Sequence, residues 1–159
     1  MLKEGRILGL ISDTHGLLRE EAVDALRGSD LILHAGDVGR PQILEALRTI
    51  APVHAVRGNV DTGTWAQALA PTEIIQAGSV MIYMLHILNN LDIDPGAVGM
   101  HIVVSGHSHK PGQAEKDGVT YINPGSAGPK RFQLPVTVAR LDLGVKPWKA
   151  EFVELEDRS

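Results

Sequence analysis

The segment Ile7-Leu8-Gly9-Leu10-Ile11-Ser12-Asp13-Thr14-His15-Gly16 decides the fold of this chain. Its first five residues are all apolar, as in strands that are buried on both faces of a parallel sheet. Apolar residues then recur at helical spacing as far as Leu26, and Gly28 is a helix stop signal. The segment therefore predicts a buried strand that leads into a helix and places Asp13 and His15 in the connection.

The same alternation continues outward to residue 57. Leu31–Leu33 and Val53–Val56 are short apolar runs, and Pro41 suits the first turn of a helix between them. Strands that alternate with helices pair in parallel through right-handed crossovers. We therefore expect three parallel strands in the first third of the chain.

The second part of the chain is mainly β. A hairpin is expected over Glu73–Gln76 and Val80–Leu85, and another buried strand over Ile102–Ser105. From Val119 onward the apolar residues alternate with period two, which indicates further strands. Two sheets packed face to face, with helices outside, would bury all of these runs, so an α/β fold is predicted.

Length, net charge and cysteine content exclude several classes of function. The 159 residues, of which 43% are hydrophobic, fit one domain over residues 1–159. A net charge of -4 provides no basic field for an extended nucleic-acid surface. The absence of cysteine excludes a disulfide scaffold, a thiolate zinc site and a cysteine nucleophile, and it agrees with a reducing compartment. No apolar run is long enough for a signal peptide or a membrane span, so we expect a cytoplasmic protein with no membrane partner.

Polar residues follow the predicted strands at their ends. Taken singly, each has an ordinary explanation: Asp37 can cap a helix, Asn59 can favour a turn, and the His-x-His of residues 107–109 can be a polar turn. Because parallel strands end at one edge of a sheet, we expect these side chains to meet there. The full series is Asp13, His15, Asp37, Asn59, His86, His107 and His109.

This series resembles the motifs of the calcineurin-like metallophosphoesterase superfamily over residues 6–126. The stretches Arg57-Gly58-Asn59-Val60-Asp61 and Ile122-Asn123-Pro124-Gly125-Ser126 are most similar to its small YfcE-like phosphodiesterase branch. The resemblance implies a four-layer α-β-β-α sandwich of two mixed sheets flanked by helices. It also implies two divalent metal ions, one bound by Asp13, His15 and His109, the other by Asn59, His86 and His107, with Asp37 bridging both.

The donor set indicates the metal and the reaction. Imidazole, carboxylate and amide donors suit Mn, our first expectation, or Fe, Ni, Co or Zn rather than Ca. Two such ions, two carboxylates and a bridging hydroxide leave a net charge of about +1, which attracts a small phosphate ester. We expect direct in-line hydrolysis of a phosphodiester by that hydroxide, with Asp37 and Asn59 as catalytic residues. The alternatives are a phosphomonoesterase of a small metabolite and a non-catalytic scaffold like the retromer subunit of this fold.

The chain departs from the family at two positions. Val60 stands where many relatives have a histidine that protonates the leaving group, so Asp61, water or the substrate must supply that proton. Ile87 follows the ligand His86 where the family usually has glycine, which alters the wall of the substrate site.

Two residues are expected on the substrate side. Arg57 is expected to bind the substrate phosphate, with a salt bridge to Asp61 or to an acidic neighbour as the alternative. Asn123 belongs to a turn whose backbone N–H groups would contact phosphate, with a purely structural turn as the alternative. A site without a cap domain should be open, so a partner or a homo-oligomer surface is expected to influence substrate choice. We expect three further histidines to be packed or to support ligands: His34, His54 and His101.

Overall fold

The computed structural model describes residues 6–131 and 133–155. Its elements, in chain order, are β1 (Ile7–Ile11), α1 (Glu20–Leu26), β2 (Leu31–His34), α2 (Pro41–Arg48), β3 (Val53–Ala55), α3 (Thr64–Gln67), β4 (Thr72–Ala77), β5 (Val80–Leu85), the 3-10 helix η1 (Leu88–Asn90), β6 (Ile102–Val104), β7 (Gly112–Lys116), β8 (Val119–Asn123), β9 (Thr137–Asp142) and β10 (Glu151–Glu154).

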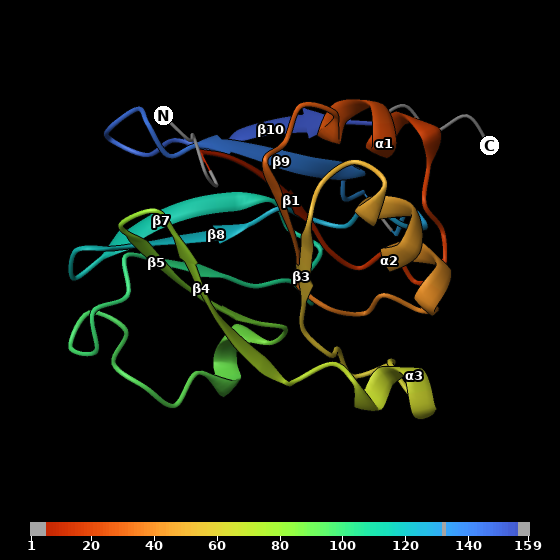
Figure 1. The fold of residues 1–159 in the computed structure, drawn as a ribbon, viewed down its shortest axis with the longest axis horizontal. Helices are drawn as coiled ribbons and strands as arrows, with labels where there is room; N and C mark the ends of the chain where they lie inside the picture. Colours follow the sequence, from red (N-terminus) through yellow and green to blue (C-terminus); the bar gives the residue numbers. More distant parts are fainter. Residues whose placement is uncertain (1–5, 132, 156–159) are drawn as a thin grey trace.

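The first sheet is built around β1. Its strand order is β10-β9-β1-β2-β3, in which β1, β2 and β3 are parallel, β9 is antiparallel to β1, and β10 is antiparallel to β9. The predicted run of strand, helix, strand, helix, strand is confirmed, and α2 begins at Pro41 as the sequence indicated. Both crossover helices lie beside this sheet (Figure 1).

The second sheet has the order β4-β5-β6-β8-β7. The β4–β5 hairpin is confirmed, and β5, β6 and β8 are parallel to one another. Strand β7 was not predicted, because Gly112–Lys116 is a largely exposed edge strand without an apolar alternation. The four-residue helix α3 was also not predicted, since a single turn has too little sequence to show a period.

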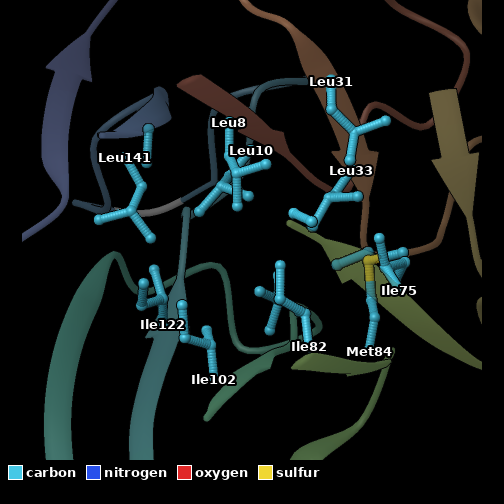
Figure 2. Packing of buried hydrophobic residues seen from close by; sticks show 14 of the residues in the cluster. Leu8, Leu10, Leu31, Leu33, Ile75, Ile82, Met84, Ile102, Ile122 and Leu141 are labelled. Carbon is cyan, nitrogen blue, oxygen red and sulfur yellow. The ribbon is translucent and has the colours of Figure 1, made fainter. Parts of the chain in front are cut away.

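The main core lies between the two sheets. Leu8, Leu10 and Leu33 of the first sheet point toward Ile82 and Ile102 of the second (Figure 2), and all five are fully buried. Burying one such side chain contributes about 1.5–3 kcal/mol relative to leaving it exposed. This layer of aliphatic side chains fixes the two sheets face to face.

The outer faces of the two sheets are covered differently. Helices α1 and α2 pack Leu26 and Leu47 against the first sheet. The outer face of the second sheet carries Val103 and is covered by residues such as Leu91 and Ile93 from the segment between β5 and β6. The α/β fold with two mixed sheets is thus confirmed. Its outermost layer on this side consists of a loop segment with the 3-10 turn η1, since one proline and two glycines interrupt residues 95–99.

The helices within the described ranges are all too short or too polar to cross a membrane.

Candidate metal centre

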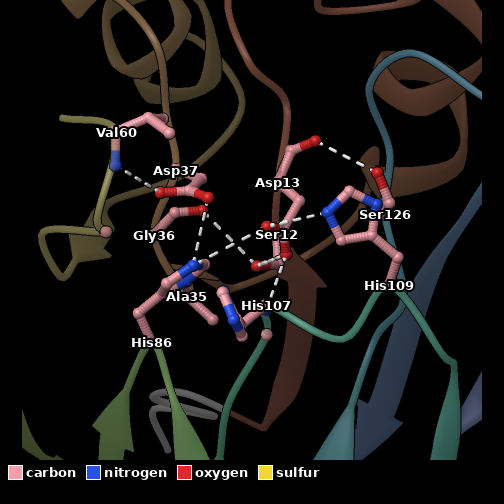
Figure 3. A network of polar contacts seen from close by, with 12 residues as sticks. Ser12, Asp13, Ala35, Gly36, Asp37, Val60, His86, His107, His109 and Ser126 are labelled. Atoms are coloured by element: carbon pink, nitrogen blue, oxygen red, sulfur yellow. Dashed lines mark hydrogen bonds and ion pairs between the residues drawn. The ribbon is translucent and has the colours of Figure 1, made fainter. Parts of the chain in front are cut away.

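All seven polar residues that follow the strands meet at one edge of the sandwich. Two groups of side chains present nitrogen or oxygen atoms that lie within 4.8 Å of one another, and Figure 3 shows several of these residues. The first group is Asp13, His15 and His109, and the second is Asp37, His86 and His107. Each member follows β1, β2, β5 or β6, so the parallel strands of both sheets deliver their ends to the same place.

The two groups share one space. His86 Nε2 lies 3.1 Å from Asp37 Oδ2 and 3.8 Å from Asp13 Oδ1, so one imidazole faces both carboxylates. His15 Nε2 lies 3.6 Å from Asp37 Oδ2 and 3.7 Å from Asp13 Oδ1. His109 Nε2 is 3.3 Å from Asp13 Oδ1. These nitrogen and oxygen atoms are therefore close enough together for one cation to contact several of them.

Two of these atoms lack the hydrogen bonds that buried polar groups normally have. Asp13 Oδ1 and His15 Nε2 are buried without a partner, whereas Asp13 Oδ2 accepts from Ser12 Oγ at 2.6 Å and from the His107 backbone N–H at 3.0 Å. Unpaired buried polar atoms are unfavourable unless a ligand satisfies them. The orphaned atoms, which point at the other donors, therefore fit divalent metal ions.

Asn59 completes the second group. Its amide oxygen lies 3.1 Å from His86 Nε2 and 3.3 Å from each carboxylate oxygen of Asp37, and it faces acceptors only. With the amide turned by half a turn, its NH2 group would donate to the same three atoms. An oxygen among acceptors is instead stabilised by a cation between them. The Asn59 amide thus lies within reach of both Asp37 and His86.

The ligand loops hold unusual backbone conformations. Among the described residues, six that are not glycine have a positive φ, and five of them belong to the two metal-binding groups. Side chains crowd the backbone in this region, so such residues persist only where the surrounding structure holds them. The five are Asp13 (φ 56°), His15 (φ 48°), Asp37 (φ 57°), His107 (φ 71°) and His109 (φ 63°).

Glycines allow two of these loops to approach one another. A Cβ atom at Gly36, which has φ of 102°, would lie 2.7 Å from the His86 ring. A Cβ atom at Gly106 would collide with Ser12 Oγ and would lie 2.7 Å from Asp13 Oδ2. Any side chain at either position would therefore push the ligands apart.

The two carboxylates are ionised although they are buried. Burial opposes the charge of Asp37, but hydrogen bonds from His86 and from the Val60 backbone N–H outweigh it and lower its pKa to about 2. Burial also opposes the charge of Asp13, and its interactions with His15 and Ser12 still hold its pKa below the ordinary value. For His86, burial is outweighed by the bond to Asp37, so its pKa is raised. The site therefore gathers negative charge that protons or metal ions must balance.

Hydrogen bonds orient the imidazoles from behind. His86 donates from Nδ1 to the Ala35 carbonyl at 2.7 Å, which leaves Nε2 free as a ligand atom. His34, fully buried, accepts at Nδ1 from the Gly36 N–H and therefore donates from Nε2 to Thr14 Oγ1 at 3.0 Å. Burial keeps it neutral by lowering its pKa to about 4.

This His34 contact links the loops after β1 and β2. Thr14 lies between the ligands Asp13 and His15, and its hydroxyl donates to the Val38 carbonyl, next to Asp37, at 2.8 Å. The sequence indicated a packed residue at His34 but not this connection. Ser12 and Ser126, which donates to the Asp13 carbonyl at 3.2 Å, were also not identified. The only signal for Ser12 is a hydroxyl beside a ligand at the end of a strand, and Ser126 is marked only by its place in the turn that follows Asn123.

Arg57 lies beside the centre. It lines a cavity of about 340 Å³ together with Asn59 and His86. The alternative salt bridge to Asp61 is absent from the described part of the chain. The Asp61 carboxylate instead accepts hydrogen bonds from three backbone N–H groups, those of Val38, Gly39 and Gly58.

Asn123 supports a ligand loop. Its amide nitrogen donates to the Gly106 carbonyl and to Ser108 Oγ, both at 3.1 Å, and its oxygen accepts from the Gly125 N–H. These bonds fix the loop that carries His107 and His109. The side chain spends its hydrogen-bonding capacity inside the protein.

The fold and this donor set define a metallophosphoesterase type of centre. Residues 7–146 match the family model described as "Calcineurin-like phosphoesterase superfamily domain", and the chain belongs to this family.

Individual relatives agree with this assignment. The chain is 34% identical over 152 residues to a "Probable metallophosphoesterase" of Methanothermobacter thermautotrophicus, with 86% of each chain covered. It is similar to the crystallised phosphoesterase YfcE of E. coli, with 25% identity, a TM-score of 0.67, and 86% and 88% of the two chains covered. It is also similar to Vps29 of Entamoeba histolytica complexed with zinc, with 25% identity, a TM-score of 0.63, and 93% and 98% covered.

Proposed function

We propose that this metallophosphoesterase is a phosphodiesterase that works with two divalent metal ions, with Mn as the first candidate. Asp13, His15 and His109 would hold one ion and Asn59, His86 and His107 the other, with Asp37 between them. The observation that carries the proposal is the convergence of these seven residues around two buried polar atoms that have no partner in the protein.

The protein groups leave the attack on phosphorus to water. When bound, two such ions lower the pKa of a shared water and polarise the phosphoryl oxygens. Two nearby hydroxyls are engaged elsewhere, since Ser12 donates to Asp13 and Thr14 donates to the Val38 carbonyl. The chain has no cysteine. These facts support direct hydrolysis without a covalent phosphoenzyme.

The surroundings of the centre favour a diester. The exposed Val60 side chain has no proton to donate, which favours esters whose leaving group needs no acid. His107 opens into a cavity of about 500 Å³, whereas Asn59 and His86 open into the cavity that contains Arg57, and Ile87 lines both. A phosphate with two substituents would direct one into each cavity. In this proposal Arg57 binds a phosphate oxygen, and the turn at Asn123 holds the loop on the opposite side.

The similarity to Vps29 makes a scaffold protein the second candidate. A scaffold does not need to hydrolyse a phosphate ester, so the activity of the metal-loaded protein separates the two functions, whereas bound zinc alone does not, because a Vps29 also binds it. Elemental analysis after reconstitution should find close to two ions per chain, and less than one would contradict the two-metal phosphodiesterase.

Activity tests the proposal directly. Protein reloaded with Mn should hydrolyse bis(p-nitrophenyl) phosphate faster than the monoester p-nitrophenyl phosphate. Asp37→Ala should reduce this activity on the order of a thousandfold, because it removes the carboxylate that serves both groups of ligands. Ile74→Ser, an exposed position on β4, is the control. Fully metallated protein without diesterase activity, or an unaffected Asp37→Ala variant, would disprove the proposal.

A further inference from the structure

The larger cavity beside the metal centre has a composition of its own. Its volume is about 500 Å³, within the range of small-molecule sites. The ligand His107 forms part of its wall, so the cavity begins at the centre. Ile87 and Leu88 line one side, Pro111 another, and Tyr121 of β8 also faces it.

Two polar side chains that line this cavity, Gln113 and Asn123, are occupied by the protein itself. Gln113 donates to the Trp148 carbonyl at 2.7 Å and accepts from the Ala150 N–H at 2.8 Å. Asn123 bonds to Gly106, Ser108 and Gly125, as described above. These groups therefore have little capacity left for a ligand.

What remains for a ligand is mainly apolar surface, together with the Asn89 side chain, the Ser108 hydroxyl and one cation. Leu88 is 40% exposed although it is a large apolar residue, and Ile87 and Tyr121 are only partly buried. A ligand that covered them would gain the free energy of removing this surface from water. Lys110 adds a positive charge, which is attracted to the face of an aromatic ring.

The smaller cavity differs in chemistry. It is lined by Arg57, Thr72, Asn90 and Asp92, so it presents charges and hydrogen-bonding groups. Ile87 separates it from the apolar cavity. The two sides of the centre are therefore suited to different substituents on the same phosphate.

We propose that the cavity between Ile87, Leu88, Pro111 and Tyr121 binds an aromatic ester group of the substrate, such as a nucleobase or an aryl ring. The proposal rests on the proposed function, because the phosphate must be held at the metal centre for its substituent to reach this cavity. The preferred substrate is then an unsymmetrical phosphodiester, with the aromatic group beside His107 and a polar group beside Arg57.

Phosphonates test the cavity without hydrolysis. Methylphosphonate, butylphosphonate and phenylphosphonate carry the same anionic head and differ only in the organic group. Their dissociation constants can be measured by amide NMR titration of the zinc-loaded protein. Phenylphosphonate should bind roughly tenfold more tightly than methylphosphonate and several-fold more tightly than butylphosphonate. Only the two larger ligands should shift the amide signals of Leu88 and Gly112.

Two variants and one control locate the effect. Leu88→Ser should reduce the preference for phenylphosphonate over methylphosphonate to about twofold, and its exposed position leaves the fold intact. Tyr121→Leu keeps an apolar side chain and should abolish the preference for phenyl over butyl. Ile74→Ser changes an exposed apolar residue that does not line the cavity and should leave all three dissociation constants unchanged.

The possible outcomes distinguish a failure of the aromatic site from a failure of the proposed function. Equal affinity for all three phosphonates would overturn the aromatic site and leave the phosphate site standing. Equal or tighter binding of butylphosphonate would overturn the aromatic assignment in favour of an aliphatic group. If no phosphonate bound to the zinc-loaded protein, the proposed function would fail and this inference with it.

Discussion

The two halves of the metal centre differ in how far the protein encloses them. In the first group Asp13 and His109 are buried and His15 is partly buried, so this half is closed. In the second group Asp37 and His86 are buried, but Asn59 and His107 are exposed to solvent, so this half is open at those two ligands. The closed half is held by side chains behind it, and the open half meets the two cavities. One side of the centre is thus built to hold its ligands in place, and the other is accessible to a substrate.

The hydrogen bonds follow the same division. In the closed half, Asp13 receives a bond from Ser12, its carbonyl accepts from Ser126, and Thr14 connects to His34. In the open half, the backbone of His107 donates to Asp13, which ties the exposed half to the closed one. The difference teaches that the buried ligands are held by the protein around them while His107 and Asn59 face solvent, so substitutions at buried and at exposed ligands should have different consequences.

The largest effect is expected from His109→Ala compared with His107→Ala. Both variants place alanine at a position with positive φ, so the change in backbone strain should be similar in the two. Each should weaken binding of a metal ion at least about a hundredfold. Only His109→Ala should also lower the free energy of unfolding of the metal-free protein, by roughly 2 kcal/mol, because it empties a buried site beside the charge of Asp13.

Metal titration and urea unfolding in the presence of a chelator measure the two quantities. Similar losses of stability in both variants would show that the halves are equally enclosed, and the comparison would be wrong.

The second effect concerns His34 and pH. In the unfolded chain its pKa is near 6.5, and in the folded protein burial lowers the pKa to about 4. The unfolded state therefore takes up a proton first, and the free energy of unfolding falls as the pH is lowered from 6.5 to 4. His34 should account for about 3 kcal/mol of this loss. In His34→Gln the profile should be flatter in this window.

Urea unfolding at several pH values, with chelator present, gives both profiles. His54→Gln removes a partly exposed imidazole and serves as the control, which should keep the steep acid loss. A His34→Gln profile parallel to that of the wild type would contradict the buried, neutral state of His34.

The smallest effect is expected from Val60→His in the open half. This change should raise the rate for diesters with alkyl leaving groups by about ten- to a hundredfold, because a histidine can supply the proton that valine cannot. Rates for aryl diesters should change little. Val60→Asn, which has no acidic proton in this range, is the matched control. An equal gain for both substrates would show that access, rather than proton donation, had changed.

The strands of the inner layers were readable from the sequence because complete burial leaves long apolar runs. Ile7–Ile11 and Val80–Leu85 are examples, and both form the predicted strands. The edge strand Gly112–Lys116 was not readable, since its side chains pack against little and carry no apolar pattern. The segment that covers the second sheet could not be predicted either, because a loop can bury Leu91 and Ile93 without a helical or strand-like spacing of its apolar residues.

The site shows the same limit. The order of Asp, His and Asn residues after the strands was enough to nominate seven ligands, and the structure brings all seven together. Asn123 is used inside the protein, as in the structural-turn alternative, but the order of residues did not reveal its partners or that His34 joins two ligand loops. Those contacts depend on residues far apart in the chain, and a hydroxyl or an imidazole in sequence carries no sign of its partner.

The amino-acid sequence by itself determined the family, the buried strands and the residue types at their ends, because apolar runs and strand-end polar residues are local patterns. Tertiary structure alone decided which half of the centre is closed, which imidazole nitrogens are free and where the apolar cavity lies. These properties arise only when two sheets pack together and bring separate loops within hydrogen-bonding distance, and burial and partner choice are set by that packing.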